Sequence, residues 1–163
     1  MELREVMQKR KSIRQYLTTP VEEEKVKAMI EAAILAPTWK NAQEIRYYVA
    51  VSEEKRQAVL DALGEGNRKK TQNAPVFLIS AVILNRAGFQ KDGSADNELG
   101  NGWGCYDLGL QNENLILKAT DLGLSTLIMG LREADRLREI LNIPETETIV
   151  SVIAIGIAAE EPI

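Results

Sequence analysis

The sequence predicts one domain in three layers, of the α+β or α/β class, with helices on both sides of a central sheet. Its 163 residues are the length of one compact domain. Two runs, Pro75–Leu84 and Thr148–Ala158, are almost continuously apolar. Half-exposed strands alternate apolar and polar residues, so these runs indicate central strands covered on both faces. Amphipathic segments with helical spacing lie between them and supply the covering layers.

Two helices are expected before the first strand. Residues 2–9 carry apolar side chains at helical spacing. The second helix opens at Thr19, which can cap it, while Pro20 suits the first turn and Glu22 completes a capping box. Pro37 ends this helix. Its buried stripe is expected to be Val26, Met29, Ile30, Ala33 and Ile34.

The remaining elements follow from the same signals. Residues 45–51 are rich in aromatic and β-branched side chains and are typical of a strand. Ser52 caps an expected helix over 53–63, which Gly64 and Gly66 end. Two more helices are expected, one at 103–122 that Gly123 closes and one at 132–141 that ends before Pro144. Between them, Leu127–Met129 is a third candidate for a central strand.

Residues 85–102 form a polar, glycine-rich segment without helical or strand periodicity. Such a long segment in a small domain is either a functional lid or disordered, and the residues leave both open. Phe89, Trp103 and Tyr106 could line a pocket or a lid. The slightly favoured alternative is that Trp103 and Tyr106 pack the start of the following helix.

The composition excludes several classes of protein. There is no histidine, which excludes Ser-His-Asp and Cys-His triads and every metal site that contains histidine. The single cysteine excludes an intrachain disulfide and fits a reducing compartment. The net charge of −4 argues against a nucleic-acid partner, and no segment has the ~20 apolar residues of a membrane span. We therefore expect a soluble, cytoplasmic protein without a metal site.

A basic segment follows the first helix. Arg10, Ser12 and Arg14 alternate, so in an extended chain their side chains point to one side, while Lys11 points elsewhere. Two guanidinium groups and a hydroxyl that converge on one point are suited to a phosphate. Taken alone, the cluster can also be a solvated basic turn, or a surface that binds RNA or an acidic partner.

A second polar segment, residues 36–43, follows the helix that Pro37 ends. Thr38, Asn41 and Gln43 offer amide, hydroxyl and backbone groups to a polar ring system. Alone, the segment is equally typical of a loop with a turn-forming asparagine.

The order of these motifs resembles the nitroreductase-like family of FMN-dependent oxidoreductases. The chain runs from Arg-x-Ser-x-Arg through a helix ending in Ala-Pro-Thr-x-x-Asn-x-Gln to a strand. No single motif is specific, but the ordered set covers nearly the whole chain. The segments that continue the resemblance are Asn67–Lys70, Asp107–Gly109, Ala119–Ser125, Leu127–Gly130, Leu141–Pro144 and Ile155–Pro162.

The resemblance implies a single domain over residues 1–163, a three-layer α/β/α fold of the α+β class with a central mixed sheet. It also implies a homodimer with FMN bound at the interface. The cofactor-binding residues it implies are Arg10, Lys11, Ser12, Arg14, Pro37, Thr38, Trp39, Asn41, Asn67, Lys70, Met129, Gly130 and Leu131.

Each group of residues has an implied role. Arg10, Ser12 and Arg14 would hold the FMN phosphate. Lys70 would add positive charge near the phosphate or the N1–C2 edge, and Asn67 would hydrogen-bond the pyrimidine side. The partner chain would supply the residues of 37–41. Residues 129–131 would lie beside the flavin with a backbone N–H facing N5, where such a dipole stabilises the anionic reduced ring.

The implied activity is hydride transfer from NAD(P)H through FMN, in ping-pong turnover, to small planar acceptors such as nitroaromatics, quinones or flavins. The flavin carries this chemistry, so no catalytic side chain is required, in keeping with the absent histidine. The alternative is a flavin-binding redox protein of the same fold without nitroreductase turnover. One departure is Glu44-Ile45 after Gln43, where the family often has proline and an aromatic residue. We expect it to alter the entry to the strand and the pocket edge.

Overall fold

The computed structural model describes residues 1–159, so the end of the Ile155–Pro162 motif lies outside the described residues. The strands are β1 (Ile45–Ala50), β2 (Val76–Ile83), β3 (Ser125–Met129) and β4 (Glu147–Gly156). The helices are α1 (Leu3–Lys9), α2 (Glu23–Ala33), α3 (Glu53–Asp61), α4 (Glu65–Thr71), α5 (Gly102–Asp121) and α6 (Ala134–Leu141), with a 3-10 turn, η1, at Trp39–Asn41.

The four strands form one sheet in the order β1-β2-β4-β3. The prediction that β2 and β4 are central is confirmed, because each has a neighbour on both sides. The prediction that Leu127–Met129 is central is wrong: β3 is an edge strand, and Ile128 is 44% exposed. All pairings between named strands are antiparallel. The parallel pairing of the expected mixed sheet is confined to an isolated bridge between Ser12 and Thr126.

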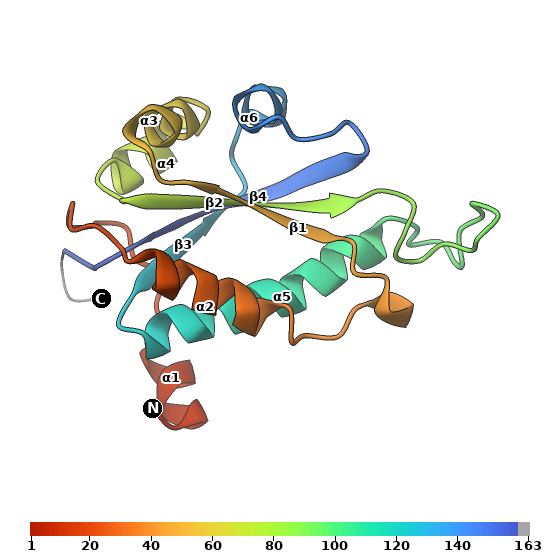
Figure 1. Cartoon of the computed structure of the whole chain (residues 1–163), viewed down its shortest axis with the longest axis horizontal. Helices are drawn as coiled ribbons and strands as arrows, with labels where there is room; N and C mark the ends of the chain where they lie inside the picture. The colour runs from red at the N-terminus through yellow and green to blue at the C-terminus, as the bar shows by residue number, and fades with distance from the viewer. Residues whose placement is uncertain (160–163) are drawn as a thin grey trace.

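Helices cover both faces of the sheet, which confirms the three-layer arrangement (Figure 1). Alternate residues of β2 face opposite layers. Phe77 and Ile79 join a core cluster with side chains of α3 and α6, whereas Val76 and Leu78 join one with side chains of α2 and α5. Burial of both faces explains why the central strands read as unbroken apolar runs.

Capping and glycine signals in the sequence predicted some helix ends correctly and others wrongly. Ser52 caps α3 as expected, since its Oγ accepts a hydrogen bond from the Lys55 N–H at 3.4 Å. Gly123 closes α5 with a φ of 76°. The Thr19 capping box is wrong: α2 begins at Glu23, and its N-cap Glu22 makes no side-chain cap hydrogen bond.

Two further predictions hold only in part. Ile34 lies beyond the last turn of α2 and is exposed rather than part of the buried stripe. Gly64 does end the helical stretch, but the chain then starts a second short helix, α4, with Gly64 as its N-cap. The Gly64 N–H donates to the Leu131 carbonyl at 3.1 Å, so a distant strand end fixes where α4 begins.

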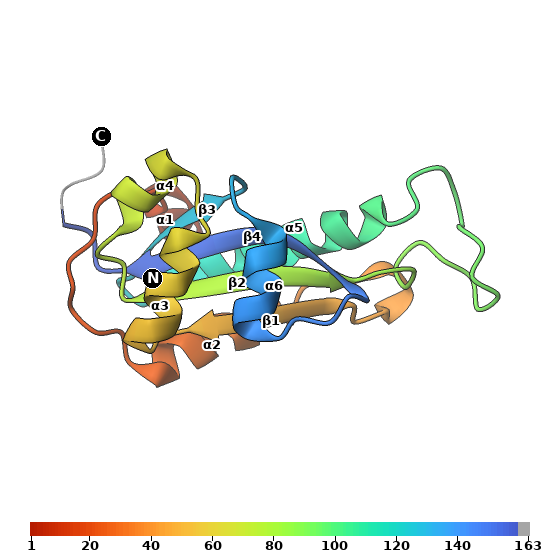
Figure 2. The same cartoon turned by 90° about the horizontal axis from the view of Figure 1, so that it is seen from above.

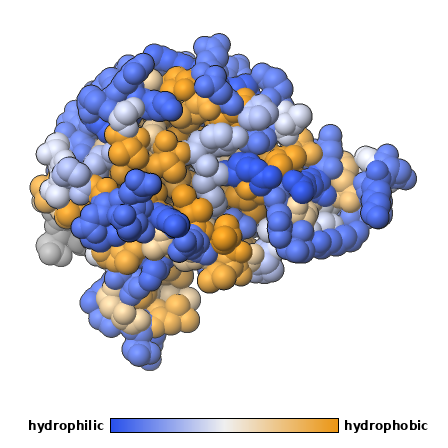
Figure 3. All heavy atoms as spheres, viewed as in Figure 1, coloured by the Kyte–Doolittle hydropathy of each residue, from blue (hydrophilic) through white to orange (hydrophobic). Residues whose placement is uncertain are grey.

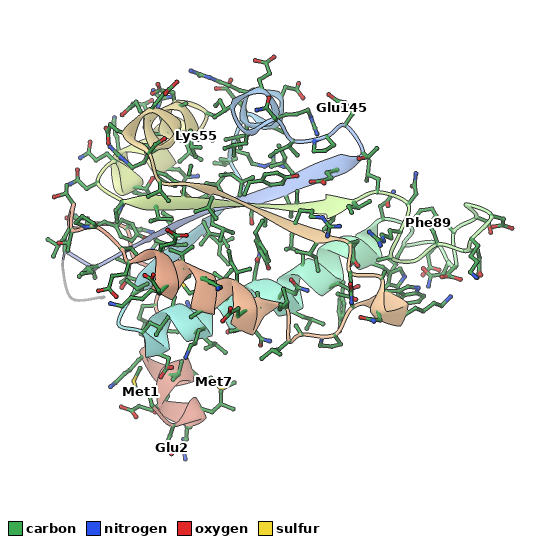
Figure 4. All side chains as sticks on the ribbon, in the orientation of Figure 1. Met1, Glu2, Met7, Lys55, Phe89 and Glu145 are labelled. Carbon is green, nitrogen blue, oxygen red and sulfur yellow. The ribbon has the colours of Figure 1, made fainter. Side chains whose placement is uncertain are left out.

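Helix α1 projects from the body of the molecule, as Figure 1 shows and as Met1, Glu2 and Met7 mark in Figure 4. Leu3 and Met7 on this helix are exposed. Figure 3 shows further apolar atoms at the surface in the middle of the same view. Within residues 1–159, no helix has the length and apolar character needed to cross a bilayer.

Candidate functional site

Residues 10–16 lie beside two strands: Ser12 and Ile13 pair with Thr126 of β3, and Tyr16 pairs with Ala158, just after β4. The Ile13 N–H donates to the Thr126 carbonyl at 3.0 Å, and both Ile13 and Tyr16 are buried. This pairing turns the side chains of Ser12 and Arg14 outward to solvent. The Arg14 guanidinium donates to the Ser12 carbonyl at 3.1 Å, so the two residues lie side by side. Arg10 is half-buried and Lys11 is exposed.

Arg14 and Lys70 line one cavity of about 510 Å³. Lys70 comes from α4, so the fold brings together two residues that are far apart in the sequence. Lys69 lines the same cavity but is paired with Glu65 at 2.6 Å. Among residues 1–159, neither Arg14 nor Lys70 forms a salt bridge. Two cations without a partner in this part of the chain are a suitable environment for a phosphate.

The end of β3 lies beside the start of α4. Met129 is buried, while Leu131 is 74% exposed. Leu63 and Arg132 form an isolated bridge next to the hydrogen bond between Gly64 and Leu131. Asn67 is half-buried on α4, one helical turn before Lys70. Residues 129–131, Asn67, Lys70, Ser12 and Arg14 therefore belong to one end of the molecule, here called the cation end.

Residues 36–43 lie at the opposite end, around η1. Thr38 and Asn41 line a second cavity, of about 350 Å³, together with Gln43, Arg46, Arg86 and Gln111. The Thr38 hydroxyl accepts the Gln43 N–H at 3.2 Å, and Gln43 donates its side-chain amide to Asn41 at 3.3 Å. Pro37 is exposed. We call this region the turn end.

Trp39 of η1 contacts the loop at 85–102 and the start of α5. Its ring packs on Trp103 with centroids 4.4 Å apart, and Trp103 meets Tyr106 edge-on at 5.7 Å. The indole N–H donates to Asp96 at 3.1 Å. Asp96 also pairs with Lys40 at 3.1 Å and accepts from Gln90. Trp103 thus packs at the start of α5, while Tyr106 is exposed.

Two buried carboxyl groups lie beneath η1. Asp107 of α5 accepts the backbone N–H of Trp39 at 2.6 Å. Glu44 precedes β1 and is fully buried. Burial raises the pKa of Glu44 to about 7; its contact with Asp107 acts in the same direction, whereas the residue's own nearby backbone N–H and the charge of Arg86 act against it. A buried, protonated carboxyl group is therefore expected here below neutral pH.

A single copy of the chain does not bring the two ends together. Figures 1 and 2 show α4 and β3 at one end of the molecule and the orange turn after α2 at the other. Phe89, labelled in Figure 4, lies on the loop at the turn end, far from Met1, which precedes α1. The residues of 37–41 therefore cannot share a site with the cation end unless another copy supplies them.

Sequence reasoning missed several residues of both ends. Lys69, Gln72 and Asn73 line the cation cavity, and only the basic run at 68–70 signalled any of them. Glu44 was noted as a departure from the family pattern, but nothing local indicated that it is buried. Asp107 lies in an expected helix, and its partner Trp39 is 68 positions away.

The chain matches known proteins over most of its length. The model of the Nitroreductase family matches residues 7–157. An FMN reductase (NAD(P)H) from Bacillus subtilis is 28% identical over 92% of the chain, and an NADPH-flavin oxidoreductase from Vibrio harveyi is 27% identical over 93%. The chain spans just under two thirds of these relatives, 63% and 64% of their lengths.

Solved structures show the same fold. A nitroreductase family protein from Clostridium novyi NT superposes with a TM-score of 0.84 at 23% identity, covering 98% of this chain and 87% of that one. The family match takes in the cation end, the turn end and all four strands. The chain therefore belongs to the Nitroreductase family.

Proposed function

We propose that the chain is an FMN-dependent oxidoreductase that takes hydride from NADH or NADPH. By ping-pong turnover it would pass electrons to small planar acceptors such as nitroaromatics, quinones or flavins. Family membership and the names of the two relatives support NAD(P)H-dependent flavin chemistry. The observation that carries the proposal is the cavity shared by Arg14 and Lys70.

The residues of the cation end suit FMN in their chemistry. Arg14, with Arg10 and Ser12 before it, would hold the phosphate, and Lys11 would add to the positive field. Lys70 would lie near the phosphate or the N1–C2 edge, and Asn67 would bond the pyrimidine side. Residues 129–131 would lie along the ring, where backbone N–H dipoles favour the reduced anion.

When bound, FMN would carry out the hydride and electron transfer, and the chain's own groups would bind and orient the cofactor. This division explains how a chain without histidine can be an oxidoreductase. The protein must hold donor and acceptor against one ring face at roughly 3–3.5 Å. Planar acceptors fit this demand because they can stack on the ring. Because donor and acceptor would use the same ring face, reduction of the flavin by NAD(P)H and its reoxidation by the acceptor would alternate.

The separation of the two ends supports a homodimer. Pro37, Thr38, Trp39 and Asn41 would reach the flavin from the partner chain. The exposed apolar side chains Leu3, Met7, Tyr106 and Leu110 on α1 and α5 offer surface for such a contact. The reducing compartment expected from the single cysteine makes the cytoplasm the proposed location.

Dilution tests the shared site. We expect flavin fluorescence to rise on dilution at the concentration where light scattering reports dissociation of the dimer. Flavin that stays bound to a monomer would contradict a site built from two chains.

An absorbance scan of the desalted protein under argon, before and after NADH or NADPH, tests the activity. Flavin bands that bleach with the reductant support the proposal. Bands that persist favour the alternative, a flavin-binding redox protein of the same fold without nitroreductase turnover. A protein that stays colourless after incubation with FMN contradicts both.

A further inference from the structure

Two carboxyl groups meet in the protein interior where the chain enters β1. Glu44 is 0% exposed and Asp107 is 4% exposed. Within residues 1–159, neither carboxyl oxygen of Glu44 finds a hydrogen-bond donor. The acid group in contact with Glu44 is Asp107, on the helix packed against it. A buried acceptor without a donor is costly, so this contact needs a physical explanation.

A single proton resolves the contact. Ionised carboxylates only accept hydrogen bonds, and two of them buried side by side repel each other. With one proton between them, the same contact becomes a charge-assisted O–H···O⁻ hydrogen bond. Asp107 already accepts the Trp39 N–H, whereas Glu44 has no donor and burial raises its pKa, which places the proton on Glu44.

Asp107 is also an anchor of a strained turn. Lys40, Asn41 and Gln43 have φ values of 46°, 54° and 52°, in the left-handed region that side chains with a Cβ disfavour. Such a backbone persists only when its surroundings hold it. The 2.6 Å hydrogen bond from Trp39 to Asp107 ties the first residue of η1 to α5.

We propose that Glu44 and Asp107 share one proton, and that this proton fixes the η1 turn, so that the turn loosens when the proton is lost. Glu44 is thus a positioning residue that acts through Asp107 on Trp39. Loss of the proton leaves two facing negative charges in the interior and pushes Asp107 away from its place beneath the turn.

The surrounding charges leave Glu44 as the group that responds near neutral pH. Arg86, from the 85–102 loop, is the cation that favours ionised Glu44. Arg46 of β1 donates to the carbonyls of Gln43 and Ile45. Lys40 is paired with Asp96 at 3.1 Å. Cys105 on α5 is exposed, and the chain has no histidine.

The consequence for the cofactor rests on the proposed function. The η1 turn carries Thr38 and Asn41, which would reach the flavin of the partner chain. A turn that loosens as pH rises would then weaken FMN binding. The proton-sharing pair itself does not depend on FMN, which allows the two ideas to be tested apart.

Tryptophan emission reports on the turn directly. The chain has two tryptophans, Trp39 and Trp103, and they pack on each other beside η1. The full chain, without added FMN, is titrated from about pH 5 to about pH 9. We expect one fluorescence transition with its midpoint near 7, the pKa to which burial raises Glu44. Emission that is flat over this range overturns the proposal.

Two conservative variants give opposite signatures. Glu44→Gln donates a permanent amide hydrogen to Asp107, so it should keep the low-pH emission throughout. Asp107→Asn can still accept from Trp39 and offers its amide to ionised Glu44, so its transition should move to lower pH. Glu147→Gln is the matched control: Glu147 is also buried, at 6% exposed, accepts from Tyr48 at 2.7 Å and lies on β4. It should retain the transition. A Glu44→Gln or Asp107→Asn variant that folds but keeps the wild-type transition and midpoint overturns the proposal.

FMN titrations at about pH 6 and about pH 8.5 complete the test. In the wild type we expect the affinity for FMN to be roughly threefold or more lower at the higher pH. This loss is measured beyond any change seen in Glu44→Gln, because that variant reports the effect of ionisation of the FMN phosphate itself. Equal pH dependence in both, with the tryptophan transition intact, overturns the link to FMN and supports the proton-sharing pair. A chain that shows the transition but binds no FMN contradicts the proposed function alone.

Discussion

The cation end and the turn end are built by different means. At the cation end, backbone pairing of Ile13 with β3 holds the chain, and the side chains of Ser12 and Arg14 are left exposed. At the turn end, side chains hold the backbone: Asp107 and Asp96 both bind Trp39. Substitutions at the first end should therefore change binding with little effect on stability. Substitutions and pH changes at the second end should alter the structure itself.

The largest expected difference between the two ends is that the turn end makes the free energy of unfolding depend on pH, whereas the cation end does not. Glu44 has a pKa raised from 4.5 to about 7 by burial, so the folded chain holds its proton more tightly than the unfolded chain. The free energy of unfolding should therefore fall as pH rises from 4.5 to 7, by up to about 3 kcal/mol, and level off above that. Urea unfolding across this window measures it.

The variant Glu44→Gln should flatten this part of the stability curve, because it removes the proton that the folded state retains. Arg14→Ala, at the cation end, should leave the slope unchanged. The lowered pKa of Asp121, held near 2 by the N-terminal amine and Lys118, affects stability only below this window. A Glu44→Gln curve as steep as the wild type would show that another group is responsible.

The next effect is on binding alone. Arg14→Ala should weaken FMN binding tenfold or more, because a charge-assisted phosphate contact contributes about 1.5–3 kcal/mol. Isothermal titration with FMN measures the change. Arg136→Ala is the matched control, since Arg136 is likewise exposed and donates to one backbone carbonyl, that of Asp61 at 2.9 Å. If Arg14→Ala binds FMN as the wild type does, the phosphate assignment is wrong.

Substitution of Asn41 should change both the free energy of unfolding and the properties of the bound flavin. Its φ of 54° should make Asn41→Ala cost about 1 kcal/mol in unfolding free energy. Asn41→Gly should avoid that cost, since glycine adopts this conformation freely. Both variants remove the amide, so both should shift the flavin spectrum or potential. An unchanged spectrum and potential would remove Asn41 from the site.

The smallest effect is expected at the surface of the turn end. Lys40 pairs with Asp96 at 3.1 Å, but its side chain is exposed. Lys40→Ala should lower the unfolding free energy by about 0.5 kcal/mol or less, and added salt should reduce the difference. A loss of several times that amount would mean that the contact holds the turn more strongly than Asp107 does.

The sequence was informative where local patterns decide the structure. Unbroken apolar runs identified β2 and β4 as central, and Ser52 and Gly123 marked helix ends correctly. It was misleading at α4, whose start depends on a hydrogen bond from Gly64 to the distant Leu131. It was also misleading at Leu127–Met129, because an apolar run does not reveal whether a strand has one neighbour or two.

The candidate residues divide in the same way. The sequence alone determined which residue types were available, that histidine chemistry was excluded and that the motifs occur in the family's order. Only the tertiary structure decided that Arg14 and Lys70 share a cavity, that the residues of 37–41 lie at the other end and that Glu44 is buried against Asp107. Burial and proximity depend on contacts between segments far apart in the chain, and no local pattern encodes them.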